Sequence, residues 1–279
     1  MEVEALDDGR LFVAKQHLSL LRANGLDSFA RVMALPEGFL RRDFPGRRTS
    51  RLELRRPDGG RQTIYLKRYF PEYLSGWSRL VRRLTGGTID EARDEWESGA
   101  QIAALGIPTL DRIARGQDAS EGNAVRSSFI MTAELSGAEE GHHYARKLDR
   151  LERRRLLRRV AELTRRLHAG GWVHKDLYLG HYLVTPTQPE PSIVLIDLQR
   201  CMQPCCFAQR WRVKDLAALV YSSLKAGVTA SDLAAGYRIY RGKRRLDGPS
   251  RRMARQVMGR VRWLKTRTPK HDRDFEQLK

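Results

Sequence analysis

The stretch that decides the fold is His174-Lys175-Asp176-Leu177-Tyr178-Leu179-Gly180-His181-Tyr182-Leu183. It follows an amphipathic segment that closes on Gly170-Gly171, and it precedes an apolar run that ends on Asp197. This pattern predicts a long helix over 146–168, then a loop, then two short buried strands. Asp176 in the loop and Asp197 after the second strand therefore stand at the ends of neighbouring elements.

Two carboxylates so placed suit phosphoryl transfer, in which a protein mainly positions charges around phosphates. The quoted loop resembles the catalytic loop of protein kinases, which reads H-R-D and has a metal ligand five residues after the aspartate. Here that ligand position holds His181. The segment Ile196-Asp197-Leu198-Gln199 stands where the D-F-G metal motif would, without its glycine.

The chain upstream of the loop offers a phosphate-binding lysine. Residues 48–69 alternate apolar and polar side chains around Pro57-Asp58-Gly59-Gly60, which predicts a β-hairpin. Lys67 ends its second strand, and Glu95 lies on the inward stripe of a helix predicted for 90–104. This is the order in which kinases place the lysine and its ion-pair partner.

Two further residues are candidates for nucleotide binding. Gly46 precedes the hairpin and is the single glycine in the place of a glycine-rich loop, so we expect weak cradling of phosphates by backbone amides. Arg47 or Arg48 would supplement it by direct charge. Glu134 lies in the apolar run 127–135, which predicts a buried strand at the end of the first lobe.

Each of these matches has a plainer interpretation when taken alone. An H-x-D triplet is common, Lys67 could be an ordinary strand-edge lysine, and Glu95 could be a solvated helix charge. Their joint order favours an α+β, two-lobed protein-kinase-like fold. We expect a small antiparallel sheet plus a helix over residues 1–135, and a mainly helical lobe over 136–279.

The chain also resembles one family, the bacterial lipopolysaccharide kinases, which comprise the core heptose kinases and the Kdo kinases. The histidine at the ligand position and the tyrosine two residues after Asp176 are features of that family. The residues that carry the resemblance are 174–183, Gly46-Arg47-Arg48-Thr49, Tyr65-Leu66-Lys67-Arg68, Glu95-Trp96 and Ile196-Asp197-Leu198-Gln199-Arg200.

The resemblance implies roles in the catalytic loop. Asp176 would be the catalytic aspartate, with His174 and Lys175 beside it, and Asp215 would brace the loop from the following helix. Lys175 stands where the family more often has arginine, which keeps the charge but loses the planar fork.

The resemblance also implies the cofactors and the acceptor. Lys67 would bind the phosphates of ATP with Glu95 as its partner, and Asp197 and His181 would hold Mg²⁺. The acceptor would be a sugar hydroxyl of the lipopolysaccharide inner core, on a heptose or Kdo, or another anionic glycan. The enzyme would work in the cytoplasm, peripherally on the cytoplasmic face of the inner membrane.

The charge of the chain agrees with an anionic partner. It has 52 Lys+Arg against 33 Asp+Glu, a net charge of +19. Residues 146–166 hold ten basic side chains, and 238–270 hold thirteen, the second as part of a tail expected to be helical or partly disordered. Solvated helix faces are the plain interpretation; an anionic glycolipid or an anionic membrane surface also fits. Nucleic acid is disfavoured because Trp263 is nearly alone as an aromatic there.

The sequence also argues against a membrane-spanning protein, a secreted protein and a cysteine-based framework or metal site. No apolar run reaches the roughly 18 residues of a membrane span, and the start of the chain is acidic, unlike a signal peptide. The cysteines, Cys201, Cys205 and Cys206, lack a C-x-x-C pair, so neither a disulfide framework nor a thiolate metal site is favoured.

Two alternatives stay open. One is a kinase of this fold that acts on another small molecule or on a protein. Only 18 residues separate Asp197 from Asp215, which is short for a peptide-binding activation segment. The other is an inactive kinase-fold module that binds an anionic partner, which the intact Lys67, Asp176 and Asp197 disfavour.

Overall fold

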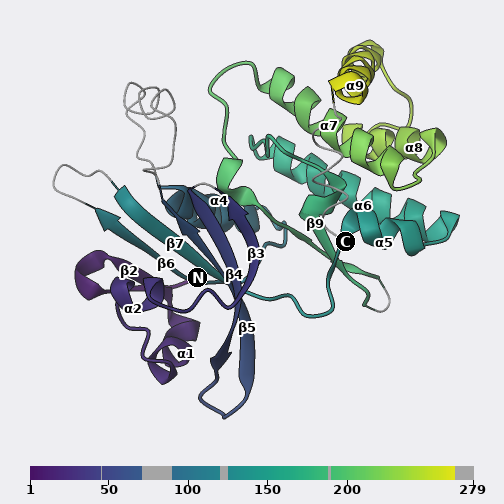
Figure 1. Cartoon of the computed structure of the whole chain (residues 1–279). Coiled ribbons are helices and arrows are strands. Elements are labelled where there is room, and N and C mark those ends of the chain that lie inside the picture. The colour runs from purple at the N-terminus through teal and green to yellow at the C-terminus, as the bar shows by residue number, and fades with distance from the viewer. Residues whose placement is uncertain (45, 71–89, 120–124, 188–189, 268–279) are drawn as a thin grey trace. The chain divides into compact units, whose positions relative to one another are not determined.

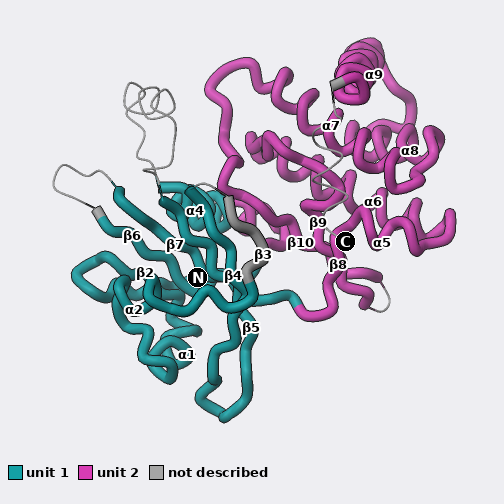
Figure 2. The backbone as a smooth tube through the Cα atoms, in the orientation of Figure 1, with its two compact units in different colours: residues 1–101, 110–135 teal, residues 102–109, 136–279 magenta. Residues whose placement is uncertain are grey.

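The computed structural model describes residues 1–44, 46–70, 90–119, 125–187 and 190–267. The chain forms two compact units (Figure 2). Unit 1 contains residues 1–101 and 110–135, and unit 2 contains residues 102–109 and 136–279. The assignment of 1–135 and 136–279 as functional lobes stays a prediction.

Unit 1 is built on a seven-stranded sheet whose described neighbours are all antiparallel (Figure 1). The strand order is β1-β2-β6-β7-β5-β4-β3. The strands are β1 (Val3–Leu6), β2 (Leu11–Ala14), β3 (Phe39–Phe44), β4 (Arg47–Arg55), β5 (Arg61–Tyr69), β6 (Arg112–Ala119) and β7 (Val125–Ala133).

The predicted hairpin is confirmed as β4 and β5. Its register pairs Leu52 with Ile64, and both side chains are buried, as the alternation of apolar residues requires. The turn closes through the Arg56 N–H, which donates to the Gly60 carbonyl at 2.8 Å. Gly59 has φ +85°, a conformation that glycine adopts without a steric cost.

Helix α4 (Glu91–Ala104) confirms the predicted helix at 90–104. Asp90 begins it, because its carboxylate accepts the backbone N–H of Arg93 at 3.0 Å. The inward face buries Ala92 and Trp96 against Tyr69 and Ile130 of the sheet. This packing fixes the orientation of α4, and with it the position of Glu95 relative to β5.

The first 44 residues add elements that the sequence analysis did not predict. They form β1, β2, β3 and two short helices, α1 (Leu18–Ala23) and α2 (Phe29–Met33). Their apolar side chains join the core of the sheet, where the rings of Phe29 and Phe129 stack with centroids 5.7 Å apart. The sheet is therefore larger than expected.

Unit 2 is mainly helical, as predicted. Its helices are α5 (Gly141–Lys147), α6 (Arg150–Ala169), α7 (Ala208–Lys225), α8 (Ala230–Arg241) and α9 (Gly248–Arg267). A small antiparallel sheet has the order β10-β9-β8, with β8 (Glu139–Glu140), β9 (Tyr182–Thr185) and β10 (Ser192–Leu195). The part of the predicted basic tail beyond residue 267 lies outside the described residues.

The predicted start of the long helix at residue 146 is wrong. Helix α6 begins at Arg150, after Asp149, whose carboxylate accepts the N–H of Glu152 at 2.8 Å. The Glu152 carboxylate in turn accepts the N–H of Asp149 at 3.2 Å, which completes a capping box. Residues 146 and 147 end the separate helix α5, and the periodicity of the sequence runs across the break.

The core of unit 2 positions the loop before β9. Leu156 and Leu167 of α6 pack with Leu177, Leu179 and Tyr182, so the apolar residues of the loop are anchored inside the unit. Within the described part of the chain, no helix combines the length and the apolar character that a membrane crossing needs.

Candidate active site

Asp215 of α7 holds the loop that contains Asp176. Asp215 is completely buried; its Oδ2 accepts the backbone N–H of His174 at 2.7 Å, and its Oδ1 accepts that of Lys175 at 2.8 Å. The Nε2 atom of His168 lies 3.2 Å from Oδ2. A buried carboxylate needs such partners, and together they fix the backbone of the loop.

His174 links this loop to the strand that leads to Asp197. Its side chain is fully buried, and its Nε2 donates to the carbonyl of Ile196 at 2.9 Å. Burial, followed by the neighbouring His181, lowers the pKa of His174, which favours the neutral ring. The ring stacks on that of His181 with centroids 5.3 Å apart. His174 therefore supports the loop and does not face solvent.

Asp176 is accessible and engaged by Arg200. Its side chain is 30% exposed, and its Oδ2 forms an ion pair with Nη1 of Arg200. The backbone carbonyl of Asp176 accepts the N–H of Tyr178 at 2.9 Å. Arg200 belongs to the motif after Asp197, but sequence analysis gave it no role; the pairing follows from the three-dimensional proximity of the two loops.

His181 and Asp197 form a pair that fits a divalent cation. Nδ1 of His181 lies 2.5 Å from the Asp176 carbonyl, which can only accept, so Nδ1 carries the ring proton. Nε2 then has a lone pair, and it faces Asp197 Oδ2 at 3.7 Å. The second ring nitrogen of a metal-ligating histidine is normally fixed in this way.

The backbone of the same loops adopts strained conformations. Asp197 has φ +63° and Lys175 has φ +71°, both in the left-handed region that side chains disfavour. Such strain costs on the order of 1 kcal/mol or more for each residue and concentrates at functional sites. The anchoring by Asp215 and His174 holds these conformations in place.

Unit 1 brings Lys67 and Glu95 together. Lys67 Nζ lies 2.6 Å from Glu95 Oε1, and the side chains are only 12% and 6% exposed. The second carboxylate oxygen, Oε2, accepts a hydrogen bond from the hydroxyl of Tyr69 at 2.9 Å. The predicted order of lysine on β5 and glutamate on α4 thus becomes a buried, hydrogen-bonded pair.

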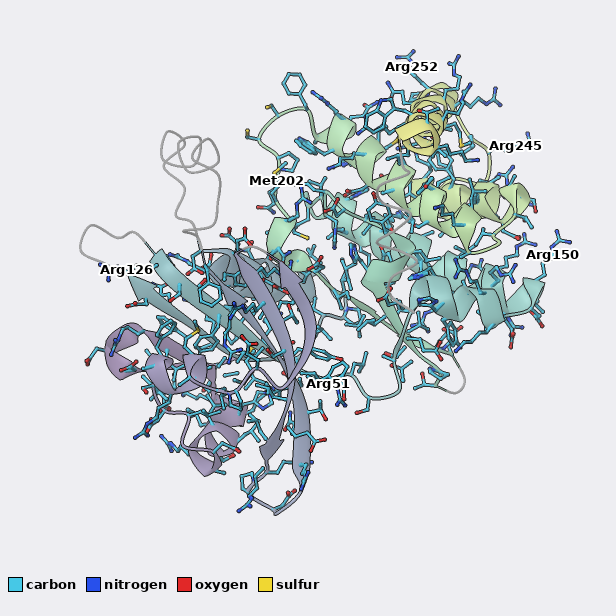
Figure 3. The ribbon with its side chains drawn as sticks, in the orientation of Figure 1. Arg51, Arg126, Arg150, Met202, Arg245 and Arg252 are labelled. Carbon is cyan, nitrogen blue, oxygen red and sulfur yellow. The ribbon has the colours of Figure 1, made fainter. Side chains whose placement is uncertain are left out.

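Gly46 and Glu134, the other two candidates for nucleotide binding, already have partners within the protein. Gly46 has φ +85°, and its carbonyl accepts the N–H of Phe70 at 2.8 Å. Glu134 accepts two hydrogen bonds from Arg51, at 2.7 and 2.9 Å, and one from the Tyr65 hydroxyl at 3.1 Å. The hydrogen bond from Arg51 is the main cause that lowers the pKa of Glu134. Figure 3 labels Arg51, which lies on β4.

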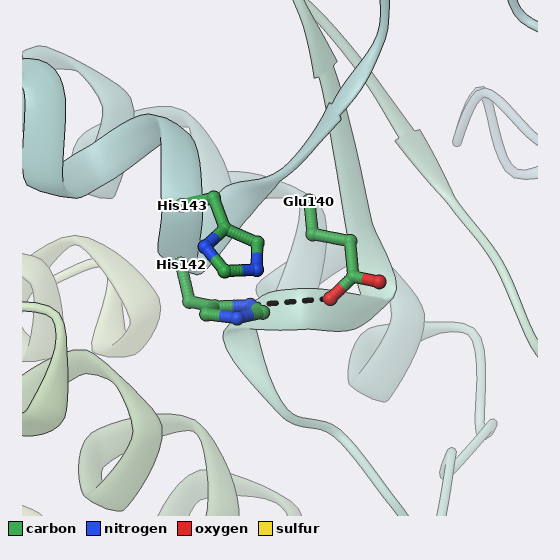
Figure 4. Close-up of side chains that lie close together, drawn as sticks. All are labelled: Glu140, His142 and His143. Atoms are coloured by element: carbon green, nitrogen blue, oxygen red, sulfur yellow. Dashed lines mark ion pairs between the residues drawn. The ribbon is translucent and has the colours of Figure 1, made fainter. Parts of the chain in front are cut away.

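A second donor set, absent from the sequence analysis, lies beside the loop. Glu140, His142 and His143 each offer a ligand atom, and these atoms lie within 4.8 Å of one another (Figure 4). His142 Nδ1 is 3.3 Å from Glu140 Oε2. Burial, then the neighbouring His143, lowers the pKa of His142 to about 4.

This cluster packs directly on the loop. A Cβ atom at Gly180 would lie 2.8 Å from His142 Nδ1, so only glycine fits at that position while His142 keeps its place. The donor set, two imidazoles and a carboxylate, is of the kind that transition metals accept. The adjacent run of two glutamates, a glycine and two histidines was the signal in the sequence that could have revealed it.

Comparison with known proteins gives a consistent result. The model of the family described as "Lipopolysaccharide kinase (Kdo/WaaP) family" matches residues 42–240. The chain is 30% identical over 260 residues to the lipopolysaccharide core heptose(I) kinase WaaP of Pseudomonas aeruginosa, covering 88% of this chain and 91% of the relative. It is also 30% identical over 231 residues to the enzyme of the same name from Escherichia coli K12, covering 78% and 83%.

A solved structure is similar over nearly the whole length. It is described as WaaP in complex with acyl carrier protein, with a TM-score of 0.66 and 27% identity, and the match covers 95% of this chain and 97% of that one. This likeness confirms the predicted protein-kinase-like fold.

Proposed function

The chain belongs to the lipopolysaccharide kinase (Kdo/WaaP) family, and from that premise we propose that it phosphorylates a heptose hydroxyl of the lipopolysaccharide inner core. As a member of that family it is an ATP-dependent phosphotransferase. The named relatives act on heptose(I), which favours heptose over Kdo as the acceptor sugar. The single observation that carries the proposal is the loop around Asp176, anchored by Asp215 and flanked by the His181–Asp197 pair.

Asp176 would act on the acceptor. Its carboxylate accepts the proton of the sugar hydroxyl as the hydroxyl oxygen forms a bond to the γ-phosphorus and the bond to the leaving oxygen of ADP breaks. Arg200 would be a positioning residue, because its guanidinium holds Oδ2 of Asp176. One carboxylate oxygen then stays oriented while the other meets the hydroxyl.

His181 and Asp197 would hold Mg²⁺. A magnesium ion neutralises charge on the β- and γ-phosphates during transfer. The donor set supports this assignment, since Asp197 supplies an oxygen and His181 presents Nε2 at 3.7 Å from it. Magnesium prefers oxygen ligands, whereas first-row transition metals accept nitrogen donors more readily, so a nitrogen here should make the site tolerant of Mn²⁺.

Lys67 would bind the phosphates of ATP. The pairing with Glu95 supports this role, because a lysine ammonium held by a buried carboxylate keeps a fixed position. Gly46 and Glu134 remain weaker candidates for contact with the nucleotide. The Glu134 side chain is already bound to Arg51 and Tyr65.

We further propose that α9 brings the enzyme to an anionic leaflet. Residues 248–267 contain seven arginines and lysines and no acidic residue. The buried face of the helix carries Met253, Val257 and Val261.

The opposite face of α9 is basic. Figure 3 shows Arg252 extending away from α9. The outer face carries Arg251, Arg252, Arg255, Arg262 and Lys265, together with the exposed Met258 and Trp263. Basic residues with an exposed tryptophan are typical of helices that lie on membrane surfaces.

The experiment that tests the proposed function is transfer of labelled phosphate from ATP to purified lipopolysaccharide core. The acceptors are core from a strain that lacks the heptose phosphate, core that already carries it, and a peptide mixture. We expect label on the unphosphorylated core alone, with the phosphate on heptose by mass spectrometry. Label on peptides, or on core whether or not the heptose phosphate is present, would contradict the proposal.

A further inference from the structure

Two lysines beside Asp176 share one tryptophan ring. Nζ of Lys175 lies 5.9 Å from the centroid of Trp211, and Nζ of Lys214 lies 5.7 Å from the same centroid. Lys175 comes from the catalytic loop, whereas Trp211 and Lys214 lie three residues apart on α7 and so on one face of that helix. All three side chains are half-buried.

The two ammonium groups near one ring repel each other. Burial and nearby arginines make their charged forms less favourable still. Burial is the main cause that lowers the pKa of both lysines, and Arg200 lowers both further. Arg260 of α9 acts on Lys214 in the same direction, against the raising effect of Asp176 and Asp215. Arg200 therefore lies near both lysines, and Arg260 lies near Lys214.

The nearby carboxylates are already committed. Asp176 is paired with Arg200, and Asp215 is bound to the backbone of the loop. Within the described ranges, neither Lys175 nor Lys214 forms an ion pair with a carboxylate. Half-buried charges without a counterion destabilise a protein, so an arrangement of this kind is suited to an anionic group from outside.

We propose that Lys175, Lys214 and Trp211, with Arg200 and Arg260 at the edge, bind an anionic group of the acceptor sugar. We call these five residues the acceptor-anion subsite. This inference rests on the proposed function and names the acceptor feature that the site would recognise, a carboxylate or a phosphate. Because Lys175 directly precedes Asp176, an anion held here would fix the distance between the acceptor and the catalytic carboxylate.

The subsite would select acidic oligosaccharides over neutral ones. An anion held by two ammonium groups forms charge-assisted hydrogen bonds, which are stronger than neutral ones. A neutral sugar would leave the lysines without a counterion, so it would be both bound more weakly and positioned less well. If the acceptor carried no acidic group, Lys175 and Lys214 would contribute nothing to its recognition.

The test compares Lys214→Gln with Lys225→Gln. Lys225 lies on the same helix, with Nζ 5.1 Å from the centroid of Tyr221, and is the matched control for loss of one charge and one ring contact. The probes are heptose-containing core oligosaccharide, the same oligosaccharide with its phosphates removed, and the same with its carboxylates methyl-esterified. Binding is measured by calorimetry, and transfer gives KM for the oligosaccharide and for ATP.

We expect Lys214→Gln to weaken binding of the native oligosaccharide by about tenfold or more and to leave the KM for ATP unchanged. Lys225→Gln should bind like the wild type. One of the two modified oligosaccharides will lack the recognised anion. It should bind the wild type more weakly than the native oligosaccharide does, whereas Lys214→Gln should bind the two about equally. Whether esterification or dephosphorylation produces this loss identifies the anion.

Three results would overturn the subsite. These are equal binding of all three oligosaccharides by the wild type, the same loss in Lys214→Gln and Lys225→Gln, or a rise in the KM for ATP in Lys214→Gln, which would assign the lysine to the nucleotide. Calorimetry does not need turnover. Anion-dependent binding without transfer would therefore support the subsite while contradicting the proposed heptose kinase activity.

Discussion

Asp215 accepts the backbone N–H of Lys175 at 2.8 Å, although Lys175 has the left-handed backbone conformation with φ +71°. The strained residue thus directly precedes Asp176 and is held by a buried negative charge. Without that anchor, relaxation of Lys175 would turn Asp176 away from its position. The position of Asp176 therefore depends on Asp215, a buried residue of α7.

We predict that Asp215→Asn disrupts the loop. The amide keeps the shape of the side chain but has one acceptor oxygen for two backbone N–H groups. The free energy of unfolding should fall by about 2–4 kcal/mol, and kcat should fall with little change in the KM for ATP. Urea denaturation and steady-state kinetics measure these effects. Wild-type kcat in a folded Asp215→Asn protein would contradict the anchoring role.

Asp176→Ala should abolish phosphoryl transfer while leaving nucleotide binding largely intact, because we propose that Asp176 acts on the acceptor hydroxyl. Fluorescent-nucleotide titration and transfer assays separate the two effects. Asp232→Ala on α8 changes another acidic residue of unit 2, one that bonds Thr229, and should leave kcat near the wild-type value. Loss of nucleotide binding together with transfer in Asp176→Ala would count against the assigned role.

Lys67→Met and Glu95→Gln should each raise the KM for ATP. The Lys67–Glu95 contact at 2.6 Å couples the two residues, so the double variant should be less impaired than the sum of the single effects. Each single change should cost about tenfold or more in kcat/KM for ATP. Strictly additive effects in the double-mutant cycle would show that the pair does not act as a unit.

His181→Asn and His181→Ala should differ. Asparagine is the usual metal ligand at this position of protein kinases, so His181→Asn should keep more activity than His181→Ala. We also expect the wild type to accept Mn²⁺ readily and His181→Asn to favour Mg²⁺ more strongly. Activity as a function of Mg²⁺ and Mn²⁺ concentration measures both. An unchanged metal dependence in His181→Ala would remove His181 from the metal site.

Reversing charges on α9 should reduce membrane binding. The triple change Arg251→Glu, Arg255→Glu and Arg262→Glu alters exposed side chains only, so the fold should persist. Each basic residue contributes about 1 kcal/mol near an anionic surface. Sedimentation with vesicles that contain phosphatidylglycerol should show a loss of binding.

The control for α9 is an equal number of reversals on α6, at Arg154, Arg155 and Arg158, which are all exposed. These changes should reduce vesicle binding less, because only non-specific attraction is lost. Equal losses in both triple variants would mean that net charge, and not the face of α9, governs binding.

Much of this architecture was predictable from local pattern. The alternation in 48–69 specified the hairpin, and the spacing of Lys67, Glu95, Asp176 and Asp197 specified a kinase-like order. Hairpins and amphipathic helices are visible because their apolar periodicity reflects which face is buried. The start of α6 was missed because the same periodicity continues across the capping box at Asp149.

The rest depended on contacts distant in the sequence. Arg200 meets Asp176 across 24 residues, and Trp211 meets Lys175 only because α7 packs beside the loop. The elements of the first 44 residues are short and bury few residues each, so their periodicity is weak. Glu134 belongs to the predicted strand run, but its pairing with Arg51 required the register of the sheet.

The most direct test of the central claim is ATP turnover by the purified protein with Mg²⁺, with and without lipopolysaccharide core that lacks the heptose phosphate. Asp197→Ala serves as the control. We expect turnover that the core stimulates, with stoichiometric phosphate on heptose, and loss of both in Asp197→Ala. Turnover that is indifferent to core would contradict the acceptor, and undiminished turnover in Asp197→Ala would contradict the site.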